Sequence, residues 1–525
     1  GQDDQALSYA RLVEGAAGYA AMYKKAGIEA GDVVIIILKH GFDLAFAFWG
    51  AVLHGAVPSI LPFLSEKLSP DIYRESLTAL MDITAPKAFL TYPEFVPEVE
   101  MARDQAVSDP LVLVGEGIAP LETIDTDQLE GLQSDAEEIV LLQHSSGTTG
   151  LKKGVALSHG AVFRQLESYA RALDLQENDV IISWLPLYHD MGLIAGFLLP
   201  ILLGKHLVLM SPFDWVKAPY RLFQAVTEYR GTLMWLPNFA YNFCARKIRD
   251  RDLEGVDLSS LRVVTNCSET IHWKSHELFL DRYRAYGLEP SALGASYAMA
   301  ENVFAVTQGG GGIRPMSTDE ISARAFQEQR AAEPASEGQT IRWVSSGTLL
   351  DNVEIRVLGE NDQPLPDRHV GEIVLRSNCM LTEYYNRPEE TEKAFLDGWY
   401  RTGDLGYVAE GEVYVTGRIK ELIIVGGKNV FPQDLERLVN DIPGVYPGRV
   451  VAFGLYNERI GTEEIAIIAE TQLEDPDERR ALENRIRLKI NQGTDVVARY
   501  VHAVDPKWLI KTSSGKIGRG ANEEK

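Results

Sequence analysis

The first sixty residues alternate between two hydrophobic patterns, and this alternation limits the chain to a small set of folds. Residues 8–26 and 42–53 have the period of helices. Between and after them, residues 33–38 and 57–61 are short runs rich in β-branched or apolar side chains, as buried strands are. Because strands joined through helices lie parallel in one sheet, the pattern predicts a βαβ architecture with a largely parallel sheet.

The length of the chain indicates more than one domain. A chain of 525 residues is too long for one compact core and suggests roughly two to four domains. Residues 353–357 and 372–375 are expected strands of a smaller β-rich part. We therefore expect an α/β protein, with a large N-terminal domain of mixed and parallel sheets covered by helices, a β-rich subdomain, and a small α/β domain at the C-terminal end.

The net charge of the chain limits the classes of molecule that it is expected to bind. Acidic residues outnumber basic residues by 75 to 51, which gives a formal net charge of −24. Nucleic acid and anionic membranes repel such a chain, so we expect neither as a partner, although a local basic patch could still bind an acidic protein.

The cysteines indicate a protein of the reducing cytoplasm. The three cysteines, Cys244, Cys267 and Cys379, have the spacing neither of a metal site nor of a disulfide framework. The most apolar segment, residues 191–210, is interrupted by Pro200 and is too broken for a membrane span, so no stable membrane insertion is expected. The chain begins without a methionine, and we expect its start to be processed or trimmed.

A loop rich in glycine, hydroxyl and lysine side chains follows another apolar run. Residues 139–142 are expected to form a buried strand, and residues 145–154 then carry three glycines, four hydroxyls and two lysines. Residues 155–173 are expected to be the helical region after this loop. Glycines let backbone N–H groups approach phosphate oxygens, and a lysine adds a point charge. The loop lacks the Gly-Lys-Ser/Thr ending of the common nucleotide P-loop, and on residue types alone an ordinary surface loop is the alternative.

The order of residues in this loop resembles the signature loop of adenylate-forming enzymes, which include acyl-CoA synthetases, peptide-synthetase adenylation domains, luciferases and fatty acyl-AMP ligases. Lys152 stands where a proline is usual. Further motifs recur in the family order along almost the whole chain. Residues 187–192, Leu-Tyr-His-Asp-Met-Gly, and residues 431–436 are similar to the fatty acyl-AMP ligase branch.

The resemblance implies ATP and Mg²⁺ as cofactors and assigns residues to them. The residues expected at ATP or AMP are Ser145, Ser146, Gly147, Thr148, Thr149, Gly150, Lys153, Ser296, Tyr297, Ala298, Asp404 and Arg418. Tyr297 would lie against adenine, and Asp404 would accept the ribose hydroxyls, as a carboxylate can do with both oxygens. Glu301 would reach Mg²⁺, which commonly takes one or two carboxylates together with phosphate oxygens.

Three further residues receive roles from the resemblance. Lys516 would bridge the acyl carboxylate and the α-phosphate, His189 would be a gate beside the acyl carboxylate, and Lys420 would be the pivot of a hinge between domains. Residue type alone would favour a solvated lysine and a structural histidine.

The acyl group has its own expected pocket. Its residues, again by resemblance, are Asn238, Phe239, Tyr241, Cys267, Ser268 and Met299. Residue type alone is equally compatible with an aromatic-rich core strand at residues 235–241. Cys267 stands where a glycine is usual, and we expect its larger side chain to narrow or redirect the pocket.

The segment 301–346 is long and polar for a connection. Ser317 and Glu320 have the spacing of a capping box, so we expect a short helix there. Most such loops are tolerated insertions. Its position and length, however, resemble the insertion of fatty acyl-AMP ligases that is thought to hinder the domain movement needed for CoA use.

The resemblance also sets the expected domain limits. Residues 1–417 would be the adenylation domain, with the insertion at about 309–338 and the β-rich part at about 346–417. Residues 418–525 would be the hinge and the mobile C-terminal domain that carries the catalytic lysine.

These motifs together predict an enzyme. It would activate a fatty acid to its acyl-adenylate with ATP, release pyrophosphate, and transfer the acyl group to the phosphopantetheine thiol of a holo acyl carrier protein, in polyketide or lipopeptide biosynthesis. The alternatives are a fatty acyl-CoA synthetase that consumes free CoA, and a non-catalytic relative that binds acyl groups or nucleotide. The presence of Lys516, Glu301 and Asp404 disfavours the last one.

Overall fold

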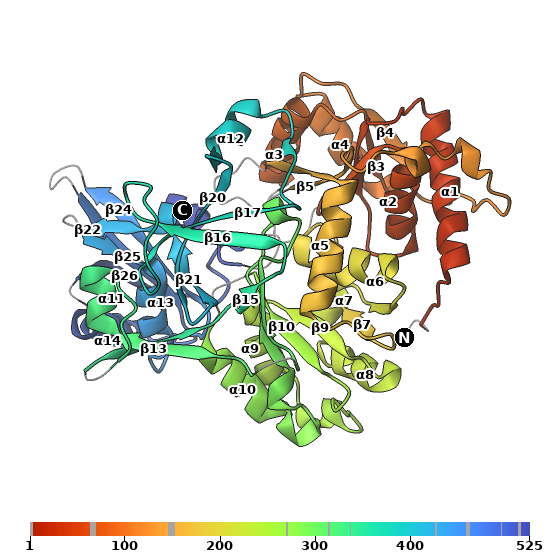
Figure 1. Cartoon of the computed structure of the whole chain (residues 1–525). Helices are drawn as coiled ribbons and strands as arrows, with labels where there is room; N and C mark the ends of the chain where they lie inside the picture. Colours follow the sequence, from red (N-terminus) through yellow and green to blue (C-terminus); the bar gives the residue numbers. More distant parts are fainter. Residues whose placement is uncertain are drawn as a thin grey trace.

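The computed structural model describes residues 4–63, 70–144, 153–268, 271–312, 315–335, 338–425, 428–457, 462–494, 496–512 and 516–525. They form a large α/β body and a smaller C-terminal body, each with its own hydrophobic core (Figure 1). The predicted α/β class is therefore confirmed.

The first sheet is parallel and has the order β2-β1-β3-β4. Its strands are β1 (Val33–Ile37), β2 (Val57–Ile60), β3 (Ala88–Thr91) and β4 (Leu111–Val114). The helices that join them or precede them are α1 (Tyr9–Lys25), α2 (Phe42–His54), α3 (Pro70–Thr84) and α4 (Val96–Arg103). The Ser8 side chain caps α1 by accepting a hydrogen bond from the Arg11 backbone N–H. All four elements predicted before residue 62 are confirmed.

A second sheet of seven strands has the order β15-β12-β11-β10-β9-β7-β8. Its strands are β7 (Val180–Ser183), β8 (His206–Leu209), β9 (Leu233–Leu236), β10 (Val263–Asn266), β11 (Leu293–Ala295), β12 (Thr307–Gly310) and β15 (Thr348–Leu349). Strands β7 to β11 are parallel, and β12 and β15 are antiparallel additions. Ligands of such sheets bind at the carboxyl ends of the parallel strands.

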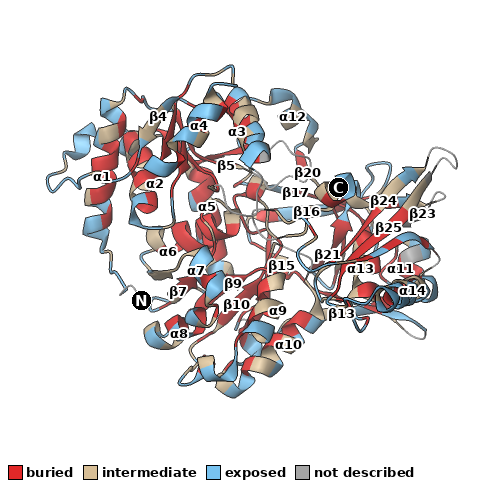
Figure 2. Ribbon diagram, turned by 180° about the vertical axis from the view of Figure 1, so that it is seen from behind, coloured by how far each residue is buried: buried red, intermediate tan, exposed pale blue. Residues whose placement is uncertain are grey.

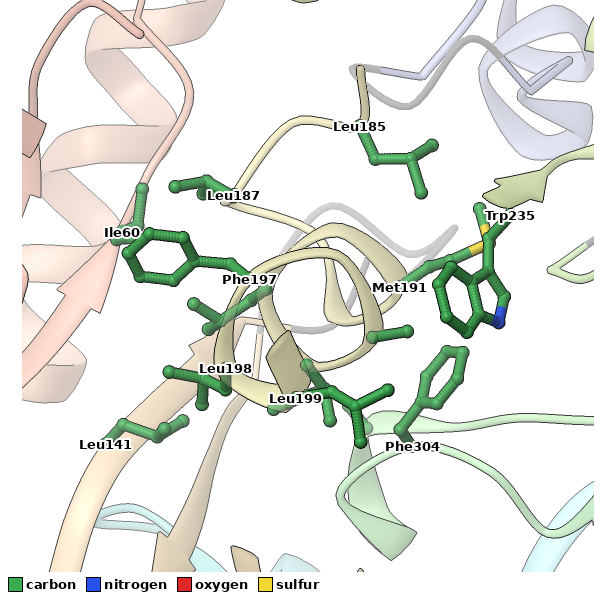
Figure 3. Close-up of a cluster of buried hydrophobic side chains, with 14 of the residues drawn as sticks. Ile60, Leu141, Leu185, Leu187, Met191, Phe197, Leu198, Leu199, Trp235 and Phe304 are labelled. Carbon is green, nitrogen blue, oxygen red and sulfur yellow. The ribbon is translucent and has the colours of Figure 1, made fainter. Parts of the chain in front are cut away.

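Helices cover the second sheet and connect its strands (Figure 1). They are α5 (His159–Ala172), α6 (Leu199–Leu202), α7 (Pro212–Lys217), α8 (Tyr220–Tyr229), α9 (Asn238–Lys247) and α10 (Trp273–Tyr283). A π-helix, Met191–Leu198, precedes α6. Figure 3 shows that it bridges the two large sheets, with Phe197 toward Ile60 and Met191 toward Trp235.

One expectation about this region was wrong. The pattern of residues 155–173 predicted a continuous helix, but residues Gly154–Ser158 form strand β6, and α5 begins only at His159. Strand β6 is buried along its whole length and pairs with β5 (Ile139–His144) and with β18 (Glu383–Tyr384). A short apolar run fits a buried strand as well as a helix, and here the pairing partners decide.

The β-rich part is an antiparallel sheet of five strands. They are β16 (Val353–Leu358), β17 (Gly371–Ser377), β19 (Phe395–Leu396), β20 (Trp399–Ala409) and β21 (Glu412–Arg418). The short helix α12 (Pro388–Lys393) lies between β18 and β19. The two strands predicted here, 353–357 and 372–375, are confirmed.

The segment predicted as an insertion forms a hairpin of β13 (Thr318–Ser322) and β14 (Thr340–Val344) with helix α11 (Ala323–Gln329) between them. The expected capping box was wrong. The helix is capped by Ser322, whose side chain accepts from the Ala325 N–H, and Ser317 instead contacts Glu412. Residues 318–322 are extended because they pair with β14, where Ile321 lies opposite Ile341.

The C-terminal body holds a sheet of β24 (Val450–Asn457), β25 (Thr462–Glu470) and β26 (Ala498–Val504). A hairpin of β22 (Ile423–Val425) and β23 (Lys428–Val430) precedes it, and the helices are α13 (Pro432–Asn440), α14 (Pro476–Gly493) and α15 (Arg519–Glu524). The outer face of α14 is exposed, whereas the central strand β25 is buried from Ile465 to Glu470 (Figure 2). No helix of the described residues is both long enough and apolar enough to cross a membrane.

Candidate active site

A cavity of about 670 Å³ lies where the large sheets, the β-rich part and the C-terminal body meet. Its lining includes most of the predicted site residues that the structure describes, namely Lys153, His189, Ser268, Ser296, Tyr297, Ala298, Met299, Glu301, Asp404, Arg418, Lys420 and Lys516. The predicted loop residues Ser145, Ser146, Gly147, Thr148, Thr149 and Gly150 lie outside the described residues.

The ends of neighbouring parallel strands place one wall of this cavity. Ser268 follows β10 and Ser296 follows β11, and these strands are adjacent in the sheet. His189 lies after β7 and just before the π-helix. Because parallel strands end at the same edge, side chains far apart in the sequence come together here.

A carboxylate with two partners forms another wall. Strands β20 and β21 pair with each other, and in this pairing Asp404 lies opposite Arg418. The Tyr297 hydroxyl donates to Asp404 Oδ2 over 2.6 Å, and Arg418 Nε lies 2.8 Å from Asp404 Oδ1. Burial and the Asp404 charge raise the pKa of Tyr297 well above its usual value, so this hydroxyl remains a donor at neutral pH. Asp404 in turn raises the pKa of Arg418.

Two tyrosines orient Glu301. The Tyr384 hydroxyl donates to Glu301 Oε1 over 2.8 Å, and it lies 2.8 Å from the Tyr400 hydroxyl. Burial raises the pKa of both tyrosines, with a further contribution from the Glu301 charge, so both remain protonated. Neighbouring Arg401 pairs with Glu372 at the same cavity.

The carboxylate side chains at the cavity fit Mg²⁺ that is bound together with a substrate. They do not fit a metal that is held by protein ligands alone. Within the described ranges, no group of three or more His, Cys, Asp or Glu side chains could hold a metal. Glu301 lines the cavity, and one carboxylate with phosphate oxygens is a common Mg²⁺ arrangement.

Lys153 lies at the β6 end of the cavity and is already paired. Its Nζ is 2.7 Å from Glu390 Oε2 on α12, and it lies 4.5 Å from the centre of the Tyr384 ring. The lysine of the glycine-rich loop thus shares a partner, Tyr384, with Glu301.

His189 and Asp190 form a close pair near Lys516. His189 Nδ1 lies 2.6 Å from Asp190 Oδ1, an ion-pair approach without the direction of a hydrogen bond. Asp190 also accepts from the Met191 N–H at the start of the π-helix. Burial acts to raise the pKa of Asp190, but His189 and Lys516 outweigh it and the pKa falls below its usual value.

Two lysines contribute to the contact between the C-terminal body and the large body. Lys511 Nζ lies 5.8 Å from the centre of the Phe239 ring. Lys274 Nζ on α10 lies 2.5 Å from Asp441 Oδ2, just after α13. In this arrangement Lys516 lines the cavity.

The residues expected at the acyl group divide into two sets. Ser268 and Met299 line the cavity, whereas Asn238, Phe239, Tyr241 and Cys267 are not part of its lining. Tyr241 and Cys267 are fully buried. The Tyr241 hydroxyl donates to the Val264 carbonyl, and Asn238 Oδ1 accepts from the Asn266 amide. The acyl role of this second set stays a prediction.

Sequence reasoning missed Tyr384, Tyr400 and Glu390, although all three line the cavity. Tyr400 directly precedes the motif of Asp404, and Glu390 follows a proline at the start of a short helix. An aromatic beside a motif and an acidic residue in a first helical turn are both ordinary, so only the fold brings these side chains to the site.

Comparisons with known proteins show the family of the chain. A family model described as AMP-binding enzyme matches residues 2–385. A 4-hydroxyphenylalkanoate adenylyltransferase of Mycobacterium tuberculosis is 30% identical over 526 residues, which span 95% of this chain and 82% of that protein.

Solved structures show the same likeness. One comes from studies of fatty acyl-adenylate ligases of E. coli and L. pneumophila; it is 26% identical, with a TM-score of 0.91 over 100% of this chain and 93% of that chain. Another, a fatty acyl-adenylate ligase of L. pneumophila in complex with acyl adenylate and pyrophosphate, is 27% identical, with a TM-score of 0.74 over 100% of this chain and 91% of that one.

Proposed function

Because the chain belongs to the family of AMP-binding enzymes, we propose that it is a fatty acyl-AMP ligase. It joins a fatty acid to the AMP part of ATP and releases pyrophosphate. The observation that carries the proposal is the meeting of Lys516, Glu301 and Asp404 at one cavity, although they come from three separate parts of the fold.

The proposed reaction needs charge neutralisation more than proton transfer. A carboxylate oxygen of the fatty acid attacks the α-phosphorus of ATP, a new P–O bond forms, and the bond from the α-phosphorus to the β-phosphate oxygen breaks. Negative charge grows on the phosphate oxygens during this step. Placement and fixed positive charge are the main contributions that a protein makes to such a transfer.

In this proposal Lys516 lies between the acyl carboxylate and the α-phosphate. Its ammonium group offsets the repulsion between two anions that must approach each other. His189, held beside Asp190, forms the gate at the acyl carboxylate.

The nucleoside part of ATP is proposed to lie along Tyr297, Asp404 and Arg418. Asp404 takes the ribose hydroxyls, and Tyr297 and Arg418 keep its carboxylate oriented. Glu301 would hold Mg²⁺ together with phosphate oxygens, and the ion would supply charge neutralisation on the polyphosphate. Tyr384 and Tyr400 fix the direction of the Glu301 carboxylate. Lys153 and the loop 145–150 take the outer phosphates.

For the second half-reaction we propose a carrier-bound thiol as acceptor rather than free CoA. The insertion supports this choice because it packs on the start of the C-terminal body. Phe326 of α11 lies 5.7 Å, between ring centres, from Phe431, which directly precedes α13. Phe326 and Phe431 share a small core with residues of β14, β20 and β21. Movement of residues 418–525 about Lys420 would have to break this core.

An assay with ATP, Mg²⁺ and a panel of fatty acids tests the proposal, with CoA in one reaction and holo acyl carrier protein in another. We expect acyl-adenylate to accumulate with CoA and the acyl group to load onto the carrier. Rapid acyl-CoA formation would contradict the choice of acceptor. Absence of fatty-acid-dependent pyrophosphate release would contradict the ligase itself and favour a non-catalytic binding protein.

A variant of Lys516 tests its role, and a variant of Lys507 supplies the control. Replacing it by alanine should lower fatty-acid-dependent pyrophosphate release by about 10² to 10³-fold, the usual loss for one group that stabilises developing charge. Replacing the exposed Lys507 by alanine should leave the rate unchanged. Equal rates for both variants would remove Lys516 from the reaction.

A further inference from the structure

The pairing of Lys153 has a consequence for the polyphosphate, and the inference drawn from it rests on the proposed function. Lys153 Nζ and Glu390 Oε2 are 2.7 Å apart, and their side chains are 32% and 37% exposed. The hydrogen bond from Lys153 and its charge lower the pKa of Glu390, so this side chain is a carboxylate at neutral pH. Any phosphate group that binds Lys153 meets an anion already in contact with it.

Glu390 has a second cation within reach. Lys393 Nζ, one helical turn further along α12, lies 3.6 Å from Glu390 Oε1. When Lys153 turns toward a phosphate, Glu390 therefore keeps a counter-charge. The free energy needed to separate Lys153 from Glu390 is correspondingly small, as it is for pairs that water reaches.

Lys153 also has a second support. Its ammonium group lies over the ring of Tyr384, whose hydroxyl donates to Glu301. The ring attracts the lysine through its face and does not depend on Glu390. Lys153 can thus exchange one anionic partner for another while Tyr384 keeps it near Glu301.

We propose that Glu390 is the exchange partner of Lys153, competing with the outer phosphates for this lysine and so promoting the release of pyrophosphate. A polyphosphate bound to Lys153 is repelled by the nearby Glu390 carboxylate. Once the bond to the α-phosphate is broken, the freed pyrophosphate is held by fewer groups, and the return of Glu390 to Lys153 displaces it.

The test is direct binding of pyrophosphate to the full-length protein, measured by titration calorimetry with Mg²⁺ present and no fatty acid. The Glu390→Gln variant lacks the competing charge and should bind pyrophosphate about two- to fivefold more tightly. This change in affinity corresponds to the free energy of one solvent-accessible ion pair. Glu390→Asp should stay close to the unmodified protein. The matched control is Glu389→Gln in the same helical turn, because Glu389 is 87% exposed and contacts only Lys393 among the described ion pairs.

The outcomes are separable from those of the ligase assay. Unchanged or weaker binding in Glu390→Gln, or an equal gain in Glu389→Gln, would overturn the exchange, even if the protein proves to be an active ligase. Absence of pyrophosphate binding to the unmodified protein would overturn it as well. Glu390→Ala serves as a second variant: it must tighten binding in the same direction if Glu390→Gln alters the melting temperature.

Discussion

At the scale of single residues, His276 shows how a buried side chain outside the cavity couples stability to pH. The ring stacks on Tyr241, with 4.8 Å between ring centres, and its Nε2 lies 2.8 Å from the Asn266 amide nitrogen. The Asn266 amide donates, so Nε2 carries no proton. Burial lowers the pKa of His276 to about 3.

This lowered pKa predicts a loss of stability in mild acid. Below its usual pKa of 6.5, His276 takes up a proton in the unfolded chain but not in the folded one, so the free energy of unfolding falls as pH decreases from 6.5 toward 3. Between pH 7 and pH 5 this one residue should contribute a loss of about 2 kcal/mol. Urea unfolding of the protein and of His276→Gln at both pH values checks it.

Comparing the unmodified protein with His276→Gln isolates the contribution of His276 to the pH dependence of stability. His40 and His272, whose pKa values burial also lowers to about 4, titrate in both proteins. We expect the difference in unfolding free energy between the protein and the variant to shrink by about 2 kcal/mol at pH 5. A difference that is the same at pH 7 and pH 5 would contradict the assignment.

The sequence motifs predicted those cavity residues whose charged side chains would perform the proposed chemistry. Lys516, Glu301 and Asp404 line one cavity as expected, because each motif places a charged group that has no core role. The partners of these groups could not be predicted. Tyr384 and Glu390 are brought to the cavity by the pairing of β18 with β6, a contact between residues more than two hundred positions apart that no local pattern records.

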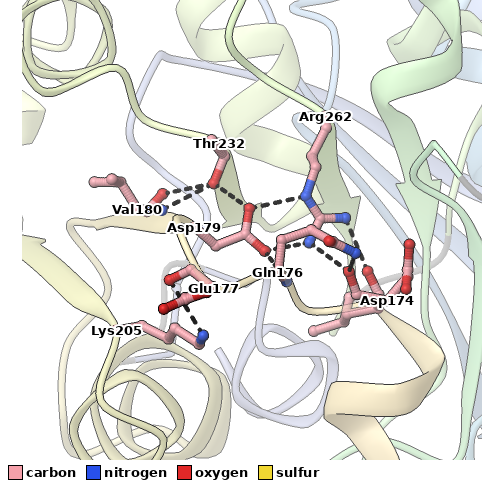
Figure 4. Close-up of polar contacts among 9 residues, drawn as sticks. Asp174, Gln176, Glu177, Asp179, Val180, Lys205, Thr232 and Arg262 are labelled. Carbon is pink, nitrogen blue, oxygen red and sulfur yellow. Dashed lines mark hydrogen bonds and ion pairs between the residues drawn. The ribbon is translucent and has the colours of Figure 1, made fainter.

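At the scale of elements, one polar network joins the start of the second sheet (Figure 4). Asp179, directly before β7, contacts the guanidinium of Arg262, and its Oδ1 accepts from the Thr232 hydroxyl over 2.7 Å. Arg262 and Thr232 directly precede β10 and β9. The three strands are therefore tied together at the end opposite the cavity.

Replacing Asp179 should destabilise the protein strongly. Its side chain is 2% exposed, and its removal leaves Arg262 partly buried without its carboxylate. We expect Asp179→Ala to lower the free energy of unfolding by about 3 kcal/mol, the lower limit for breaking a buried pair, because Arg262 keeps the carbonyl of Leu173.

The control is a second aspartate–arginine pair of the same sheet region. Asp257 and Arg230 are 2.9 Å apart but are 48% and 62% exposed, so Asp257→Asn, which keeps the oxygen that accepts from the Ser259 N–H, should change stability little. Thermal and urea unfolding of both variants checks the contrast. Equal effects would show that burial does not determine the contribution of Asp179.

Element prediction succeeded where periodicity and length agree and failed where pairing decides. The helices near residues 8–26 and 42–53 were predicted because each is long and is followed by a buried strand. The helices after residues 154 and 317 exist as α5 and α11, but both were predicted to start too early, because residues 155–158 and 318–322 become strands through partners that lie elsewhere in the chain. A short segment contains too few residues for its period to outweigh those contacts.

At the scale of the whole molecule, the two bodies have separate hydrophobic cores but share the core in which α11 packs with Phe431. This shared core predicts how the acceptor thiol could be changed. Phe326→Ala removes the ring that contacts Phe431, so residues 418–525 should move more easily and acyl-CoA formation should rise, while acyl-adenylate formation stays within about twofold.

Rates of acyl-CoA and acyl-adenylate formation by Phe326→Ala and by Phe163→Ala check this prediction. Phe163 is a suitable control because it is 47% exposed on α5 and lies outside the shared core. If Phe326→Ala folds and still forms no more acyl-CoA than the control, the insertion does not restrain the C-terminal body.

The cations of the cavity have counter-ions that are fixed to the protein and cannot diffuse away. Lys153, Arg418 and Arg401 each face a carboxylate of the same chain. A tethered carboxylate has a high effective concentration, so a monovalent anion from solution displaces it poorly. A polyanion that meets several cations at once gains the same advantage of linkage. We therefore expect the cavity to favour polyvalent over monovalent anions before any base or acyl group is recognised.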